Sequence, residues 1–463
     1  MPAPNAPETS RFQSLVAKHG KKTLIALVII TVLGFGLRMD RVIHPLGTPG
    51  DDALAYRALA ESLYEDKSYG GADFKTPSDW SPGAPLIYGA AYYATGGVRD
   101  GVGRGVEALF GTAAILLGYL LALRLSRRKS AALLAAGLIA AYPPFIHSTG
   151  ALMSEPPALF MLPAAVLTFL WADSRGSPWA WLLPGFLFGL TALIRPEYLA
   201  VAFAFGLLLL VRAWRAAGPE RSQKAKRAIL GGVAFCLAIF LPIIPWTIHN
   251  YVTLDRVVPI TTGGGKATFV GTYLPADGEY QQVKAELYEK QTGNRLDPDS
   301  DELAAIDPVP LFDKEAEKYP ELSRDAALGR IGKENFREYI QDDPISYAGM
   351  TLRKIGRMWG TGIGEAMSSP LGSLLQKILV LAGLAGLMLL AWRKRWETIP
   401  VAIPIVVVTA VGALTLAPPR RNEILMTLVL PLAAVALAEA AAWIAGRINR
   451  DETDTDPVNP GSA

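Results

Sequence analysis

The sequence predicts an all-α polytopic membrane protein, a bundle of about ten transmembrane helices with two extracytoplasmic loops that carry short amphipathic helices. The first observation is composition, because 51% of the 463 residues are hydrophobic and only 19% are charged, whereas soluble proteins contain about 25% charged residues. The second is that the apolar residues lie in long continuous runs. The third is an uneven distribution of lysine and arginine between those runs. Together these observations exclude a soluble protein.

Ten apolar runs approach the length of a membrane span, which needs about 20 mostly apolar residues. They are Thr23–Leu37, Gly105–Leu123, Ala131–Ile146, Pro156–Ala172, Trp179–Ile194, Tyr198–Val211, Ala228–Ile248, Leu371–Trp392, Ile399–Leu416 and Ile424–Ala445. Each is expected to be a helix, because the runs are continuous and lack the alternation of barrel strands. The first run has no convincing small-residue cleavage site after it, so we expect an uncleaved helix rather than a signal peptide.

Basic residues set the expected orientation of these helices. Lysine and arginine cluster before the first run and after the second, sixth and eighth runs. The short connections of opposite parity contain only Arg195, Arg420 and Arg421. The positive-inside rule therefore places both termini in the cytoplasm. We expect a multi-pass protein integral to the cell (inner) membrane, with its active site on the extracytoplasmic side.

The domain organisation follows from this orientation. We expect a cytoplasmic N-terminal segment over residues 1–22, a transmembrane domain over 23–446 and a disordered cytoplasmic tail over 447–463, which is polar and rich in Asp, Pro and Gly. Residues 40–104 form the first extracytoplasmic loop and residues 249–370 the second. The second loop is expected to carry amphipathic helices that lie over the membrane face.

Several function classes are excluded by charge, cysteine content and spacing. The net charge of +3 gives no basic field for nucleic acid, so no nucleic-acid partner is expected. The single cysteine excludes an intrachain disulfide or a cysteine-ligated zinc site. The Gly263–Gly265 run before Lys266 lacks the glycine spacing of a P-loop. It is either a plain turn or a turn whose N–H groups approach a phosphate.

The first loop opens with two adjacent carboxylates, Asp51 and Asp52, ahead of an Ala/Leu-rich stretch. Taken alone, this pattern is more often a helix cap than a catalytic acid. A functional carboxylate there would sit just outside the first span, where it could act on a substrate anchored in lipid. Further along the loop, the Trp80–Tyr88 segment and the tyrosines after it fit an interfacial helix anchored by aromatic residues. The same residues could shape a lipid groove.

Eight charged residues are expected to share the extracytoplasmic surface. They are Asp51, Asp52, Arg104, Glu155, Arg195, Glu197, Arg420 and Arg421. For each residue alone, snorkelling or a local ion pair is the commoner role. Their common side favours a site, because acids there could take a proton from an acceptor and arginines could bind a phosphate.

These motifs, in this order, resemble the GT-C glycosyltransferases, in the branch of the protein O-mannosyltransferases and the lipid A aminoarabinose transferases. The resemblance covers most of the membrane region and implies a GT-C-like bundle. It rests on Gly50–Tyr56, Pro82–Leu86, Arg104, Ser154–Pro156, Arg195–Glu197, Pro245–Asn250, Gly263–Gly265 and Arg421.

The resemblance implies an inverting transfer of a sugar from a polyprenyl-phosphate donor to a lipid, protein hydroxyl or glycan acceptor. It implies that Asp52 is the general base, with Asp51 beside it and Glu155 as a second catalytic carboxylate. It implies that Arg104, Arg195 and Arg421 lie near the donor phosphate, a group to which we add Lys266 and His249. The family commonly has arginine where His249 stands, which predicts a weakened phosphate contact there. We assign Tyr56, Tyr88 and Glu197 to the substrate groove.

Cofactor and mechanism class are less constrained by the sequence. No cofactor is certain, and no ligand set is specific for a divalent metal, although the carboxylates could hold one. The alternative function is a transporter or flippase of a lipid-linked sugar. Such a protein is expected to have ionisable residues near the bilayer midplane and internal repeats. The span centres are nearly free of charge and no repeat is found, which favours chemistry at the membrane surface.

Overall fold

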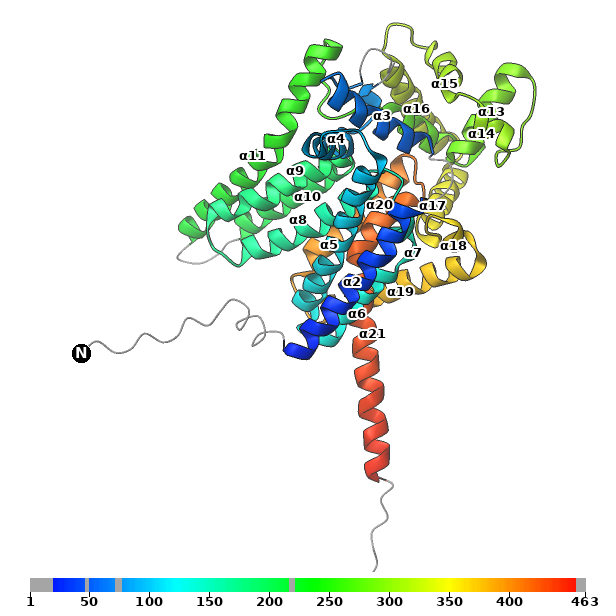
Figure 1. Ribbon diagram of the computed structural model, residues 1–463. Coiled ribbons are helices and arrows are strands. Elements are labelled where there is room, and N and C mark those ends of the chain that lie inside the picture. The colour runs from blue at the N-terminus through cyan, green and yellow to red at the C-terminus, as the bar shows by residue number, and fades with distance from the viewer. Residues whose placement is uncertain (1–19, 46–49, 71–76, 216–220, 455–463) are drawn as a thin grey trace, which may run out of the picture.

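The protein is a helical bundle in a computed structural model that describes residues 20–45, 50–70, 77–215 and 221–454, and all regular elements within these ranges are helices (Figure 1). The bundle is formed by α2 (Lys21–Ile43), α5 (Asp100–Ser126), α6 (Lys129–Ala141), α7 (Pro143–His147), α8 (Glu155–Asp173), η2 (Pro178–Trp181), α9 (Leu182–Ile194), α10 (Tyr198–Arg215), α11 (Arg221–Leu254), α19 (Pro370–Trp392), α20 (Thr398–Leu414) and α21 (Arg420–Asp454). The predicted runs are helical except for Tyr142 and the last two residues of Ile399–Leu416, which confirms the fold class. Seven of these helices are long and apolar enough to span a membrane, and Lys129–Ala141, Pro178–Ile194 and Thr398–Leu414 are shorter apolar helices.

The third predicted span is broken rather than continuous. Helix α6 ends at Ala141, Tyr142 has an extended backbone, and α7 begins at Pro143. Pro143 and Pro144 have no N–H groups to donate to the carbonyls of Ile139 and Ala140 four residues earlier. The guanidinium of Arg38 in α2 donates to those two carbonyls instead, at 3.1 and 3.2 Å. The break is therefore stabilised by a fully buried arginine from another helix.

Close helix contacts inside the bundle use small residues. Gly185 and Gly189 on α9 face α11, where an added Cβ atom would lie 2.3 Å from the carbonyl oxygens of Phe235 and Ile239. This spacing is the small-xxx-small pattern that lets membrane helices approach closely. The contact fixes the position of α9, whose last residue, Ile194, precedes Arg195.

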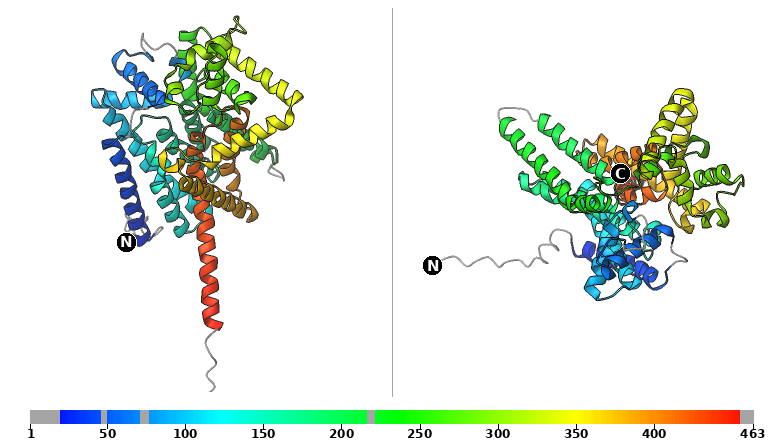
Figure 2. Two further views of the ribbon diagram at one scale, coloured as in Figure 1. Left: turned by 90° about the vertical axis from the view of Figure 1, so that its right-hand side faces the viewer. Right: turned by 90° about the horizontal axis from the view of Figure 1, so that it is seen from above.

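The remaining helices gather at one end of the bundle, which we call the loop end. They are α3 (Asp51–Glu65), η1 (Pro77–Asp79) and α4 (Gly83–Thr95) from the first loop, and α12 (Gly264–Thr272), η3 (Leu274–Ala276), α13 (Tyr280–Thr292), α14 (Asp301–Ala305), α15 (Pro308–Ala316), α16 (Arg324–Asp342), α17 (Pro344–Gly360) and α18 (Glu365–Ser368) from the second. Helix α2 begins and α21 ends at the opposite end, the terminal end (Figures 1 and 2). Both long loops therefore lie on one side of the bundle.

The second loop has an apolar core of its own. Phe269, Val283, Leu287, Phe312 and Leu328 are among the buried residues of this core. The sequence predicted amphipathic helices spread over the membrane, whereas α12, α13, α15 and α16 pack on one another. Burial of their apolar faces against each other removes more apolar surface from water than separate interfacial helices would.

The two loops are joined at η1. The hydroxyls of Thr261 and Thr262 and the N–H of Thr262 donate to Ser78 and Asp79, and Arg324 of α16 forms an ion pair with Asp79. These contacts fix the second loop on the first, above the outer ends of the bundle helices.

The last helix extends beyond the end that the sequence predicts for the transmembrane domain. Helix α21 continues to Asp454, into the tail expected to be disordered from residue 447. Residues 455–463 and most of the N-terminal segment, residues 1–19, lie outside the described residues.

Candidate active site

Four charged side chains from distant parts of the sequence form a network at the loop end. Asp52 lies in the first turn of α3, Glu155 begins α8, Arg195 lies between α9 and α10, and Arg420 begins α21. Arg420 donates to the carboxylate of Asp52, and its Nε lies 4.0 Å from Oε1 of Glu155. Gly50, not an aspartate, is the N-cap residue of α3. Asp52 is therefore bound by an arginine from the other end of the chain.

Arg195 is the most enclosed cation of this network. Its Nη1 donates to Oε1 of Glu155 at 2.9 Å, and its Nε donates to Oε1 of Glu197 at 2.8 Å. Nη1 also lies 3.4 Å from the hydroxyl of Ser154. The side chains of Arg195 and Glu155 are only 9% and 1% exposed. With both carboxylates attached, Arg195 is a fixed part of the site wall.

The electrostatics of the site are set by these arginines. Burial alone would raise the pKa of Glu197, but the positive charges of Arg195 and Arg421 outweigh it and lower the pKa to about 2. Tyr56, one turn after Asp52 on α3, is buried against Glu155. Burial and the charge of Glu155 raise the pKa of Tyr56 to about 12. Glu197 is therefore ionised and Tyr56 is a neutral phenol at physiological pH.

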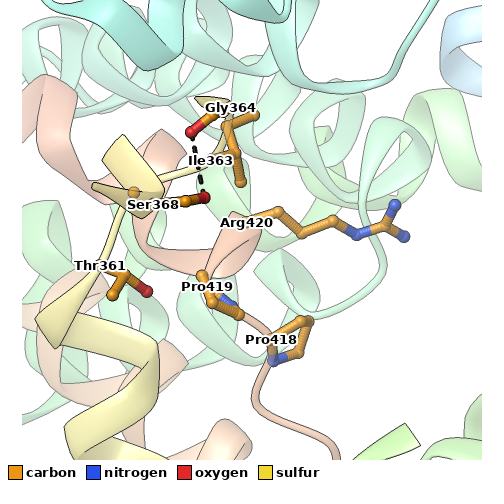
Figure 3. Close-up of a pocket in the computed structure, with 8 residues that line it drawn as sticks. Thr361, Ile363, Gly364, Ser368, Pro418, Pro419 and Arg420 are labelled. Atoms are coloured by element: carbon orange, nitrogen blue, oxygen red, sulfur yellow. Dashed lines mark hydrogen bonds between the residues drawn. The ribbon is translucent and has the colours of Figure 1, made fainter. Parts of the chain in front are cut away.

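A cavity of about 470 Å³ lies beside Arg420. It is lined by Thr361–Gly364, Ser368, Pro418, Pro419 and Arg420. Figure 3 shows the stem of Arg420 at the edge of this cavity, with the guanidinium pointing away from the other labelled residues. The cavity and Asp52 therefore lie on different sides of the same arginine.

Arg421 and Asp51 stand next to the residues that form the network. Nη1 of Arg421 donates to the hydroxyl of Thr415 at 3.0 Å, and its charge faces Glu197. Asp51 is the first residue of α3, but its side chain lies outside the described residues.

Three residues expected at the donor phosphate have other partners. Arg104 lies 3.5 Å from Asp100, which also accepts from Arg57 at 2.7 Å. The ring of His249 stacks on Trp246, with centroids 4.7 Å apart. The ammonium of Lys266 lies 5.5 Å from the ring centroid of Tyr280, and its charge faces Asp79 and Asp52. Lys266 is therefore electrostatically linked to Asp52.

The backbone N–H groups of the glycine turn are occupied. The N–H groups of Gly265 and Lys266 donate to Oδ1 of Asp325, at 2.7 and 3.2 Å. A side chain at Gly265 would collide with Asp325, because an added Cβ atom would lie 1.8 Å from its carbonyl oxygen. The turn joins α12 to α16. Its N–H groups bind the carboxylate of Asp325, whereas a phosphate was one of the two ligands or roles considered from the sequence.

Tyr88 and Glu107 lie behind the site. Tyr88 is fully buried, and its hydroxyl donates to Oε1 of Glu107 at 2.9 Å. Glu107 also accepts from the N–H groups of Gly150 and Met153, both at 2.7 Å. Tyr88 therefore has no exposed surface to offer a groove. It belongs to the support of the segment that leads into Ser154 and Glu155.

Sequence reasoning missed several buried polar residues that the structure brings to the site. Glu107 holds the turn before Glu155, and Glu423 is buried beside Ser148 and faces the charge of Glu155. Arg420 was grouped with the outer charges but was not assigned to the donor or the base. The available signal was the position of Glu107 inside an apolar run, because charges at membrane depth are usually paired or functional.

The described carboxylates of the site have guanidinium partners. In the parts of the chain that the structure describes, no group of three or more His, Cys, Asp or Glu side chains could hold a metal ion. The carboxylates of Asp52, Glu155 and Glu197 face guanidinium groups instead.

Comparison with known proteins matches part of the chain to a family model and the fold to solved structures. Residues 89–255 match the family described as dolichyl-phosphate-mannose-protein mannosyltransferase. No curated protein matches the sequence.

Among solved structures, the chain is similar to the oligosaccharyltransferase AglB from Archaeoglobus fulgidus in complex with an inhibitory peptide and a dolichol-phosphate. The TM-score is 0.55 at 18% identity, over 96% of this chain and 53% of that one. The same enzyme in complex with Zn and sulfate gives 0.53 at 16% identity, over 91% and 50%. ArnT from Cupriavidus metallidurans bound to undecaprenyl phosphate gives only 0.40 at 12% identity, over 90% and 78%. The chain spans about half the length of the oligosaccharyltransferase that it matches.

Proposed function

The chain has the GT-C glycosyltransferase fold and matches the mannosyltransferase family over residues 89–255. We therefore propose that the protein is a membrane glycosyltransferase that takes a sugar from a polyprenyl-phosphate donor. It transfers the sugar with inversion to a lipid, protein hydroxyl or glycan acceptor on the extracytoplasmic face, which we equate with the loop end.

The observation that supports this proposal best is the network of Asp52, Arg420, Glu155 and Arg195. Its members come from four segments that meet only in the folded bundle, and all of them lie at the ends of helices next to the two loops. A partly exposed carboxylate beside arginines is what transfer from a lipid phosphate needs. Similar structures contain dolichol-phosphate in one case and undecaprenyl phosphate in another, which is consistent with a lipid-linked donor.

The proposed reaction is a single displacement at the anomeric carbon. The acceptor oxygen forms a bond to that carbon while the bond to the phosphate oxygen breaks, and Asp52 takes the acceptor proton. The leaving polyprenyl phosphate keeps the electron pair of the broken bond, and arginine neutralises its charge. One carboxylate on the face opposite the leaving phosphate is enough for inversion, unlike the two carboxylates of a glycosidase.

Within this reaction we give Glu155 the role of positioning Arg195 in place of that of a second catalytic carboxylate, and the other site residues have the following roles. Glu155 and Glu197 hold Arg195 in position through the two hydrogen bonds described above. Arg195, Arg420 and Arg421 supply the positive field for the phosphate, and Lys266 extends it toward the second loop. Tyr56 and Glu197 border the space next to Asp52. Arg104 and His249 remain proposed phosphate contacts that would have to leave their present partners.

The test is a transfer assay with purified protein and a panel of polyprenyl-phosphate sugars, scored by release of polyprenyl phosphate. We expect Asp52→Asn to reduce turnover by about 10²- to 10⁴-fold, the range of a lost general base. Donor binding should survive, because the amide keeps the shape of the carboxylate.

Asp173→Asn is the matched control for that variant. Asp173 pairs with Arg212 at 2.6 Å, at the terminal end of the bundle. The Asp173→Asn variant should turn over donor at the rate of the unmodified protein. A normal rate in Asp52→Asn would move the base to another residue, and no release from any donor would remove the proposed donor class.

A further inference from the structure

We propose that Arg420 is a latch on Asp52 that the donor phosphate releases, so that the base becomes free only after the donor has bound. This inference rests on the proposed function and deepens it. It assigns to Arg420 a positioning role that links occupation of the donor site to readiness of the base.

The contacts of Arg420 distinguish it from the other site arginines. Arg195 is 9% exposed and donates to two carboxylates. The side chain of Arg420 is 39% exposed, and its direct carboxylate contact is the one to Asp52, with Glu155 farther away at 4.0 Å. Among the described ion pairs of the site, the pair with Asp52 is therefore the one that can be exchanged without opening the core.

The surroundings of Arg420 leave room for that exchange. The cavity of about 470 Å³ borders its stem, on the side away from Asp52 (Figure 3). Its walls are formed by Pro418, Pro419 and the Thr361–Gly364 turn, which carry no charge. A rotation of the side chain toward this cavity would carry the guanidinium away from Asp52 without moving α21.

The chemistry of the two anions favours exchange when a phosphate arrives. A guanidinium can bind a phosphate through two parallel N–H donors, whereas Arg420 holds Asp52 through Nη1 alone. The anionic donor also compensates the positive charge that Arg420 takes with it. Asp52 is left with its lone pairs free to accept the proton of an acceptor hydroxyl, on the face opposite the phosphate.

The latch predicts an order of events. While Arg420 is bound, its guanidinium occupies Oδ2 of Asp52, so that an acceptor hydroxyl cannot donate to this oxygen. Donor binding moves the guanidinium to the phosphate, and only then can the acceptor hydroxyl lose its proton to Asp52 as its oxygen attacks the anomeric carbon. Without donor, the enzyme does not present a free base to water or acceptor.

The experiment measures how accessible the Asp52 carboxylate is, with no turnover required. The full chain in detergent is treated with a carbodiimide and a small amine, and labelling of Asp52 is followed by peptide mass spectrometry, with and without undecaprenyl phosphate. Binding of undecaprenyl phosphate is measured separately by native mass spectrometry. We expect bound undecaprenyl phosphate to raise the labelling rate of Asp52 about fivefold, the upper end for loss of a partly exposed ion pair.

Variants of Arg420 test the latch by removing the ion pair without a ligand. Arg420→Gln should label about fivefold faster than the unmodified protein without undecaprenyl phosphate, by the same ion-pair range, with no further increase when it is added. Arg420→Lys should restore slow labelling and part of the response. Arg212→Gln is the matched control, because Arg212 pairs with Asp173 at a similar exposure of 42%. It should behave like the unmodified protein.

The outcomes separate the latch from the proposed function. Unchanged or slower labelling of Asp52 with undecaprenyl phosphate bound would overturn the latch and leave the donor class intact. Slow labelling in Arg420→Gln would overturn it too. Failure of undecaprenyl phosphate to bind would remove both the latch and the proposed donor.

Discussion

At the scale of the residue, the structure separates neighbours that the sequence could not. Arg420 pairs with Asp52, whereas Arg421 donates to Thr415 and faces Glu197. Adjacent side chains on a helix point about 100° apart, so Arg420 and Arg421 face different partners. The resemblance assigned Arg421, and not Arg420, to the donor phosphate, whereas the structure shows that Arg420 is the partner of Asp52.

Glu197 gives a prediction for stability at low pH. Its pKa falls from an ordinary value of 4.5 to about 2 in the folded protein. A depressed carboxyl pKa stabilises the folded state above the unfolded pKa, and this contribution is lost as pH falls through the folded pKa. The contribution at neutral pH is roughly 3 kcal/mol, at about 1.4 kcal/mol per pKa unit. We therefore expect Glu197→Gln to unfold at lower temperature than the unmodified protein at pH 7.

The pH dependence of that difference is the measurement. Melting temperatures in detergent should converge as pH falls from about 4.5 toward 2. Glu317→Gln is the control, because Glu317 is 64% exposed in its pair with Lys314. A constant gap between Glu197→Gln and the unmodified protein over this pH range would show that Glu197 acts through packing instead.

At the scale of the element, apolar runs predicted every bundle helix but not the irregular places between them. The run Ala131–Ile146 reads as one span by composition, although Pro143 and Pro144 within it mark the break. What composition could not supply is the partner, since Arg38 lies about 100 residues earlier in the chain. The same holds for Glu107, whose acceptor role depends on a turn formed some 40 residues later.

Arg38 gives a prediction for the stability of that break. Arg38→Met would remove the donors to the Ile139 and Ala140 carbonyls, which two prolines already deprive of helical partners. An unsatisfied buried carbonyl costs about 1–3 kcal/mol, so the melting temperature should fall by several degrees. Lys22→Met, an exposed position on the same helix, should melt like the unmodified protein. Equal melting of both variants would mean that water reaches the break.

At the scale of the whole molecule, exposed tryptophans mark a membrane interface at the end that lysine and arginine predict to be cytoplasmic. Trp179, Trp214, Trp392 and Trp443 are 61–80% exposed. They lie at helix ends or connections that share a side with the basic clusters, away from the loops. Tryptophan is enriched at membrane interfaces, so these side chains fit an interfacial belt at the terminal end.

This orientation can be tested by accessibility from either side. In a Cys236→Ala background, we expect Glu317→Cys, directly after α15, to react with a membrane-impermeant thiol reagent in intact cells. Ser174→Cys, at the end of α8, should react only after the membrane is opened. Reaction of Ser174→Cys in intact cells, with Glu317→Cys protected, would invert the orientation and place the loop end in the cytoplasm.

The sequence predicted the helical bundle, because long apolar runs are a local property of the chain. It did not predict how the loops contact each other. The pairing of Asp79 with Arg324 joins residues 245 positions apart, and hydrophilic loop segments carry no periodicity that fixes such a pair. The apolar core inside the second loop was hidden for the same reason.

That separate core has a consequence for divergence among relatives. Substitutions within residues 280–316, which span α13 to α15, can accumulate, or the segment can be exchanged as a cassette, while α12 keeps its contacts with the bundle, such as the hydrogen bond that the N–H of Leu416 donates to the carbonyl of Ala267. A chimaera that keeps Ser78, Asp79 and Arg324 would keep the junction between the loops. Proteins with this fold can therefore change the surface that the second loop exposes without changing the bundle helices that position the site.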